Sequence, residues 1–163
     1  MTEIHPIPPL YSKNSEILIL GSFPSVKSRE NEFFYAHPQN RFWKVLSAVF
    51  NSPLPQNTDE KKELVLKNKL ALFDVIKQCE IKGSGDSTIK NVIPNDLSPI
   101  IESSNIKHIF LNGKTAEKYY KRYIAPIIDI EFTTLPSTSP ANAAYSLDRL
   151  IEEWKIIDKK LWA

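Results

Sequence analysis

Three segments of the chain carry side chains of the types that bind and cleave substrates. The first is long and rich in aromatic and amide groups, and it contains Gly21-Ser22-Phe23-Pro24-Ser25 and Phe34-Tyr35-Ala36-His37-Pro38-Gln39-Asn40-Arg41-Phe42-Trp43. An aromatic side chain on a loop can stack on a base, which contributes about 1–3 kcal/mol, and we assign this role to Tyr35. Phe42 and Trp43 follow a helical pattern and are expected to pack against the core. Asn40 lies at the start of that helix, where capping is the commonest role of asparagine.

The second segment is the turn Leu111-Asn112-Gly113-Lys114, and the third is the run Leu135-Pro136-Ser137-Thr138-Ser139-Pro140-Ala141-Asn142-Ala143. Asn112 follows an apolar run, so its amide is expected to project into a cleft, where it can pair with the edge of a base. Capping of the next helix is the alternative. The hydroxyl and amide groups of the third segment suit contacts with phosphate. The alternative is an ordinary strand-to-helix turn, capped by Ser139 or Asn142.

Other kinds of chemistry lack the residues that they need. The chain has four glycines and neither a phosphate-binding loop nor a dinucleotide-binding motif. Ser22 and Ser25 lack the flanking glycines of a serine-hydrolase elbow. The three histidines do not have the spacing of metal ligands and there is a single cysteine, so we expect no metal site and no disulfide within the chain. Asp74 and Asp86 remain as carboxylates that can line a pocket.

Apolar runs alternate with amphipathic stretches along the chain. Strands are expected at residues 17–20, 70–76, 106–111 and 128–135, and helices at 40–50, 58–69, 96–102, 114–123 and 142–160. Thr58 or Asp59 is expected to cap the second of these helices. Strands that alternate with helices predict an α/β fold, a three-layer α/β/α sandwich around a four-stranded parallel sheet. Ligands bind such sheets outside the carboxyl ends of the strands, where the three segments would meet.

Composition places few further limits on function. A chain of 163 residues, 42% hydrophobic and 25% charged, is expected to form one globular domain over residues 1–163. It contains no apolar run long enough for a transmembrane helix and no apolar signal at its start, so we expect a cytoplasmic protein that binds no membrane. A net charge of +2 argues against binding by bulk charge, while an enzyme needs only a local basic face.

The order of these motifs resembles that of the uracil-DNA glycosylase superfamily, and the resemblance runs from the first strand to the last helix. The run from Ala36 to Lys44 is similar to the equivalent run of the mismatch-specific uracil-DNA glycosylases. Together with the first and third segments, it looks closest to the hypoxanthine-DNA glycosylases, also called DNA-deoxyinosine glycosylases. The resemblance implies a four-stranded parallel α/β/α fold.

The resemblance also implies roles for single residues. Asn40 matches a catalytic asparagine, Tyr35 the aromatic residue that stacks on the extruded base, and Asn112 the asparagine that reads the edge of the base. Phe23 stands where mismatch-specific relatives have a catalytic asparagine, and Leu135 where the classical uracil enzymes have a histidine. Strong activity on uracil is therefore not expected. The wedge that fills the vacated stack falls at residues 140–142, where Ala141 is small.

The implied function is monofunctional hydrolysis of the N-glycosidic bond of a deaminated base in DNA, with hypoxanthine preferred, by a monomer that needs no cofactor and no metal. The base-binding residues would be Ser22, Phe23, Pro24, Ser25, Tyr35 and Asn112, and Asn40 would be catalytic. The DNA contacts would come from Lys27, Arg41, Lys114, Ser137, Thr138, Ser139, Pro140, Ala141 and Asn142. The alternatives are a uracil or G:T mismatch glycosylase, a non-catalytic module that binds damaged DNA, and a small-molecule hydrolase or nucleotide-binding protein.

Overall fold

The centre of the protein is a parallel sheet of four strands, seen in a computed structural model that describes residues 2–158. The strands are β2 (Ile17–Gly21), β3 (Leu70–Asp74), β6 (His108–Asn112) and β7 (Phe132–Leu135). Their order is β3-β2-β6-β7, and every neighbouring pair is parallel. All residues of β2 and β3 are buried, as expected for strands that are covered on both faces.

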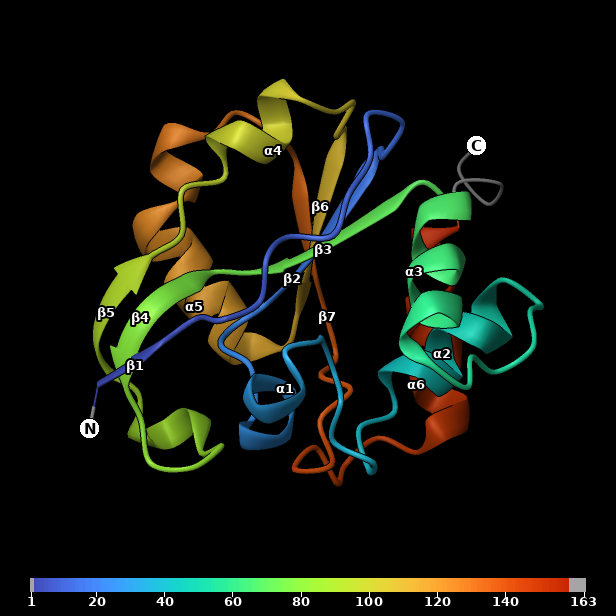
Figure 1. The fold of residues 1–163 in the computed structure, drawn as a ribbon, viewed down its shortest axis with the longest axis horizontal. Coiled ribbons are helices and arrows are strands. Elements are labelled where there is room, and N and C mark those ends of the chain that lie inside the picture. The colour runs from blue at the N-terminus through green and yellow to red at the C-terminus, as the bar shows by residue number, and fades with distance from the viewer. Residues whose placement is uncertain (1, 159–163) are drawn as a thin grey trace.

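Helices cover the two faces of this sheet (Figure 1). On one face lie α2 (Phe42–Val49), α3 (Thr58–Lys67) and α6 (Leu147–Trp154), and on the other α4 (Ser98–Glu102) and α5 (Lys114–Tyr123). Phe42 and Trp154 join α2 to α6 edge to face, with ring centroids 5.9 Å apart, and both are fully buried. The predicted α/β/α sandwich is confirmed, and Phe42 packs in the core as expected.

A second, antiparallel sheet was not predicted. It consists of β1 (Thr2–Ile4), β4 (Ile76–Glu80) and β5 (Lys90–Pro94), in the order β1-β4-β5. The predicted strand at 70–76 was wrong at its end, because the chain leaves the central sheet after Asp74. The backbone N–H of Val75 donates to the carbonyl of Gly21, and β4 then begins at Ile76. One central strand thus leads directly into the second sheet.

Short helices complete the fold. Several helices and strands begin or end at other residues than predicted. The first segment contains α1 (Val26–Asn31), and 3-10 turns occur at Asp86–Thr88, Ala125–Ile127 and Lys155–Ile157. The predicted strands at 106–111 and 128–135 begin too early, while α5 has the predicted bounds. Among residues 2–158, no helix is both long and apolar enough to span a bilayer.

The closing helix is shorter than predicted. It begins at Leu147 rather than 142, because the Ser146 side chain accepts a hydrogen bond from the backbone N–H of Arg149 and so caps the helix there. The predicted residues 159 and 160 lie outside the described part of the chain. The cap of α3 was also wrong: Asn57, not Thr58 or Asp59, accepts from the backbone N–H of Glu60 at 2.9 Å.

Candidate active site

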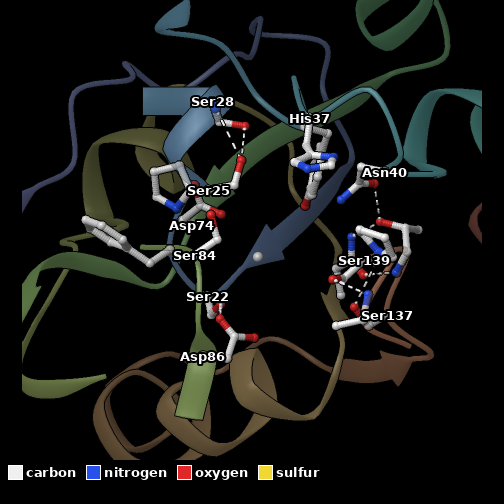
Figure 2. Close-up of a pocket in the computed structure, with 18 of the residues that line it drawn as sticks. Ser22, Ser25, Ser28, His37, Asn40, Asp74, Ser84, Asp86, Ser137 and Ser139 are labelled. Carbon is white, nitrogen blue, oxygen red and sulfur yellow. Dashed lines mark hydrogen bonds between the residues drawn. The ribbon is translucent and has the colours of Figure 1, made fainter. Parts of the chain in front are cut away.

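A cavity of about 490 Å³ opens at the carboxyl ends of β2, β3 and β6 (Figure 2). Its floor is buried and includes Gly21, Asp74 and Asn112, while Pro140 and Ala141 are exposed at its lip. The remaining lining residues are Ser22, Phe23, Pro24, Ser25, Ser28, Phe34, Tyr35, His37, Asn40, Ser84, Gly85, Asp86, Ser87, Ser137, Thr138 and Ser139. All three segments singled out in the sequence therefore contribute to one cavity.

Most of the residues assigned from the sequence meet at this cavity. Ser22, Phe23, Pro24, Ser25, Tyr35, Asn40 and Asn112 line it, as do residues 137–141. Four residues assigned to DNA contacts lie outside the lining: Lys27, Arg41, Lys114 and Asn142. Phe23 and Leu135, which stand in place of an asparagine and a histidine, are both buried.

Asn40 presents a hydrogen-bond donor to the cavity. Its Oδ1 accepts from the backbone N–H of Phe42 and from the hydroxyl of Thr138, each at 2.9 Å. A backbone N–H can only donate, so these contacts settle which end of the amide is oxygen. The Nδ2 atom points toward the cavity (Figure 2). The expectation that Asn40 caps the helix was wrong: the N-cap of α2 is Arg41, which makes no side-chain capping hydrogen bond, and Asn40 instead accepts from Phe42, the first helical residue. Its side chain is fixed by Phe42 and Thr138, which places the donor.

Thr138 links the second and third segments to Asn40. Its backbone N–H donates to Asn112 Oδ1 at 3.0 Å, and its hydroxyl accepts from Asn112 Nδ2 at 3.1 Å while donating to Asn40. Thr138 is fully buried. The turn before α5 fits closely here, because Gly113 has φ +99° and a Cβ on it would lie 3.0 Å from Ser137 Cβ. Both ends of the Asn112 amide are thus occupied by Thr138 in this structure.

Tyr35 is held in an unusual backbone conformation. Its φ of +51° lies in the left-handed region, where a residue with a side chain is strained by about 1–2 kcal/mol. The ring stacks on Phe42, with centroids 4.0 Å apart, and also lines the cavity. Its hydroxyl is buried and has no hydrogen-bond partner among residues 2–158. Burial, and then the Asp74 charge, raise the pKa of this phenol, while the nearby Asn112 amide lowers it without reaching hydrogen-bond geometry.

Asp74 is a buried carboxylate on the floor of the cavity, and its side chain contacts His5. His5 Nε2 lies 2.7 Å from Asp74 Oδ2, and the two side chains are 2% and 5% exposed. The backbone N–H of Ile7 donates to His5 Nδ1 at 3.2 Å, so Nδ1 carries no proton and Nε2–H is the donor to Asp74. No described residue donates to the other carboxylate oxygen, Oδ1, which lies beside Gly21.

A second carboxylate, Asp86, lies at the lip. The Ser22 hydroxyl donates to it at 3.3 Å. Partial desolvation raises the pKa of Asp86, and the nearby hydroxyl groups of Thr115 and Ser22 lower it. Because Asp86 is exposed to solvent, screening weakens these effects.

Arg41 has a structural role that the sequence did not indicate. Its guanidinium donates to three carbonyl oxygens of the loop at 136–146, those of Ser139, Asn142 and Tyr145. A planar guanidinium has five donors in fixed directions, which suits several acceptors at once. Arg41 thereby holds the loop whose tip forms the lip of the cavity.

We expect Arg41→Lys to lower the free energy of unfolding by about 2–3 kcal/mol, because each hydrogen bond to a charged donor contributes about 1.5–3 kcal/mol and an ammonium cannot reach three carbonyls. For a chain of this size that corresponds to a fall in Tm of roughly 5–10 °C. Thermal unfolding followed by circular dichroism measures it. The matched control is Arg149→Lys, because Arg149 is exposed, makes one 3.4 Å hydrogen bond to the same loop and otherwise lies over the ring of Tyr145, where a lysine can also lie. An equal change in both variants would refute the role of Arg41.

Lys27 and Lys114 are exposed cations outside the cavity. Lys27 lies 3.7 Å from Glu30 within α1, and Lys114 is the first residue of α5. Neither is engaged as Arg41 is, so both remain available as phosphate contacts. In the described part of the chain, no group of three or more acidic, histidine or cysteine side chains has the arrangement of a metal site.

Sequence reasoning missed the part of the site contributed by the amino-terminal segment. His5 reaches Asp74 across 69 positions of the chain, and no local pattern predicts such a pair. Asp74 had a recognisable signal, since it is a carboxylate at the end of a buried strand, and it was predicted only as a residue that can line a pocket. His37 and Ser84 also line the cavity without having been assigned.

Comparisons with known proteins agree with this architecture. Residues 8–159 match the family model described as the uracil DNA glycosylase superfamily. The chain is 35% identical over 155 residues to a protein of Methanosarcina acetivorans named hypoxanthine DNA glycosylase, covering 92% of this chain and 94% of the relative. A protein of Methanosarcina barkeri with the same name is 34% identical over 137 residues, covering 83% and 85%.

A solved structure has the same fold over its whole length. It is the solution NMR structure of a Methanosarcina acetivorans protein described as a uracil DNA glycosylase, with a TM-score of 0.84, 30% sequence identity and full coverage of both chains. The expected enzyme class, a DNA glycosylase acting on N-glycosyl bonds, is confirmed by these matches. The chain belongs to the uracil DNA glycosylase superfamily.

Proposed function

We propose that this DNA glycosylase releases hypoxanthine from deoxyinosine in DNA and leaves an abasic site. The observation that carries the proposal is the Asn40 amide, whose nitrogen is held toward a cavity of suitable size at the carboxyl ends of the sheet. The names of the two Methanosarcina relatives support hypoxanthine as the base. The buried Phe23 and Leu135 agree with weak activity on uracil, because the side chains that serve the uracil enzymes at these positions are absent.

The proposed reaction begins with extrusion of the nucleotide into the cavity, which is easiest at an imperfect pair such as that of hypoxanthine with thymine. Tyr35, supported from behind by Phe42, stacks on the base. The glycosidic bond then breaks through an oxocarbenium-like sugar, and negative charge develops on the departing base. Asn40 Nδ2–H donates to the base as this charge grows, which lowers the barrier because the donor is already in position. Water adds to the sugar C1′, and the proton that it releases reaches the departed base through solvent, so that neutral hypoxanthine is formed.

The residues around the cavity favour hydrolysis without strand cleavage. No lysine occurs among the described residues that line it, so no amine is available to form a Schiff base with the sugar. Residues 137–142, with Lys27 and Lys114, are proposed to contact the DNA backbone, and Pro140 and Ala141 occupy the exposed lip where a wedge would enter the stack. The proposal also keeps the expectation of a cytoplasmic monomer that needs neither a metal nor a cofactor.

A panel of labelled oligonucleotides tests this function. Each carries hypoxanthine, uracil, xanthine or a G:T mismatch at one position, in duplex and single-stranded form. We expect free hypoxanthine by chromatography, and strand cleavage only after alkali. Release of uracil or thymine with hypoxanthine untouched would instead support a uracil or mismatch glycosylase, and binding of damaged DNA without product at high enzyme concentration would support a non-catalytic module.

A further inference from the structure

Asp74 and His5 have no role in the bond cleavage described above. Their position in the cavity suits recognition of the base. Asp74 lies on the buried floor of the cavity, whereas the lip is formed by exposed residues. The sugar of an extruded nucleotide remains attached to the DNA backbone, so it must stay near the lip, and the base enters first. A side chain on the floor therefore meets the far edge of the base rather than the glycosidic bond.

His5 determines which oxygen of the Asp74 carboxylate is available to the edge of the base. The backbone N–H of Ile7 fixes the proton of His5 on Nε2, and Nε2–H occupies Asp74 Oδ2. Rings of Phe23, Phe34 and Phe73 surround the imidazole, with centroids 5.0–6.4 Å away. The imidazole cannot turn freely in this cage. Asp74 is thus held with Oδ1 as a lone hydrogen-bond acceptor beside Gly21, where the cavity is open.

We propose that Asp74 Oδ1 accepts a hydrogen bond from the ring N1–H of hypoxanthine, with His5 as the residue that positions the carboxylate. This inference rests on the proposed function. In adenine and cytosine, the ring nitrogen that pairs with the partner strand, N1 or N3, is a hydrogen-bond acceptor. Deamination converts this nitrogen into an N–H donor. A carboxylate on the floor binds the donor and repels the lone pair of the parent base. Guanine shares an N1–H, and its stable pairing with cytosine opposes extrusion.

The test uses Asp74→Asn, whose orientation the structure predicts. His5 Nε2–H can donate only to the amide oxygen, so the amide NH2 would face the cavity and present a donor in place of an acceptor. We expect kcat/KM for release of hypoxanthine to fall by about 10- to 100-fold, the effect of losing a hydrogen bond to a charged group. Release of unsubstituted purine, whose N1 is an acceptor, should fall less or rise, so the ratio of the two rates changes by at least tenfold.

The ratio separates recognition from a general structural effect. A variant that merely folds less well loses activity on both bases equally, and an unchanged ratio with a folded protein would overturn the inference. Asp129→Asn is the matched control, because Asp129 is exposed and lies outside the cavity lining. With the unaltered protein, DNA containing 1-methylhypoxanthine, which lacks the N1–H, should be cleaved at least tenfold more slowly than DNA containing hypoxanthine, and equal rates would overturn it too.

The failure of this inference can be distinguished from failure of the proposed function. If the unaltered protein releases no hypoxanthine from any substrate, the proposed function is wrong. If it releases hypoxanthine and Asp74→Asn keeps the same preference over purine, only the role of Asp74 is wrong. His5→Phe tests the positioning role, since it keeps an aromatic ring at this place and removes the donor to Asp74. We expect a smaller change in the same ratio.

Discussion

Replacing Asn40 with alanine should lower kcat for hypoxanthine release by about 10²- to 10³-fold. This is the loss measured when one donor to developing negative charge is removed from an enzyme. Single-turnover assays with deoxyinosine DNA separate this step from product release. Asn40→Ala also removes the acceptor for Phe42 N–H and the Thr138 hydroxyl, so its effect combines lost chemistry with a loosened site.

Asn40→Asp separates these two contributions. One carboxylate oxygen can accept both hydrogen bonds that Asn40 Oδ1 accepts, while the second replaces the Nδ2 donor and repels a departing anion. We expect a Tm close to that of the unaltered protein and a loss of kcat at least as large as for alanine. Asn14→Ala is the matched control, because Asn14 is exposed and precedes β2 at the opposite end of the sheet. Full activity of Asn40→Asp would exclude Asn40 as a donor to the base.

Gly21→Ala should lower kcat/KM by about 100-fold or more. The added Cβ would lie 2.5 Å from Asp74 Oδ1 and 3.2 Å from the Tyr35 hydroxyl, and the first of these distances is well inside van der Waals contact. Asp74 is held by His5 at 2.7 Å, so the carboxylate and the tyrosine must shift within the cavity. A displacement of about 1 Å in a site of this kind can reduce a rate by 10²-fold. Steady-state kinetics on deoxyinosine DNA measure the change.

Gly83→Ala is the control for adding a methyl group to a glycine. Its Cβ would have no neighbour within 4 Å, and Gly83 does not line the cavity, although its φ of +58° makes alanine unfavourable there. We expect it to lose about 1–2 kcal/mol of stability and to keep its kcat/KM. If Gly21→Ala were as active as Gly83→Ala, the floor of the cavity would accept a methyl group at residue 21, and this prediction would be wrong.

The central sheet was predictable because its strands are short, apolar and separated by helical patterns. The helix Lys114–Tyr123 was predicted with its observed bounds, since it follows a buried strand and a glycine and has a clear apolar stripe. The second sheet was not predicted. Residues 2–4 pair with residues 78–80. Such a pairing of distant segments cannot be predicted from three residues that show no clear alternation of apolar and polar side chains.

The composition of the cavity could be predicted better than the hydrogen bonds within it. Residue type and strand ends brought Tyr35, Asn40 and Asn112 to one cavity, but the partner of each polar group depends on distant residues. Arg41 looks like a phosphate contact by type, yet its acceptors are carbonyl oxygens about a hundred positions along the chain. Asn112 looks like a free amide, yet Thr138 occupies both of its ends.

The contacts of Thr138 have a kinetic consequence. Three chain segments that converge on one buried hydroxyl are ordered before any DNA arrives, so little conformational entropy is lost when a nucleotide enters. A repair enzyme meets a vast excess of intact nucleotides, and a slot that is already formed can test each extruded base without waiting for a loop to close. Scanning speed would then depend on how fast the duplex opens, and the free and DNA-bound enzyme should superimpose closely around residues 40, 112 and 138.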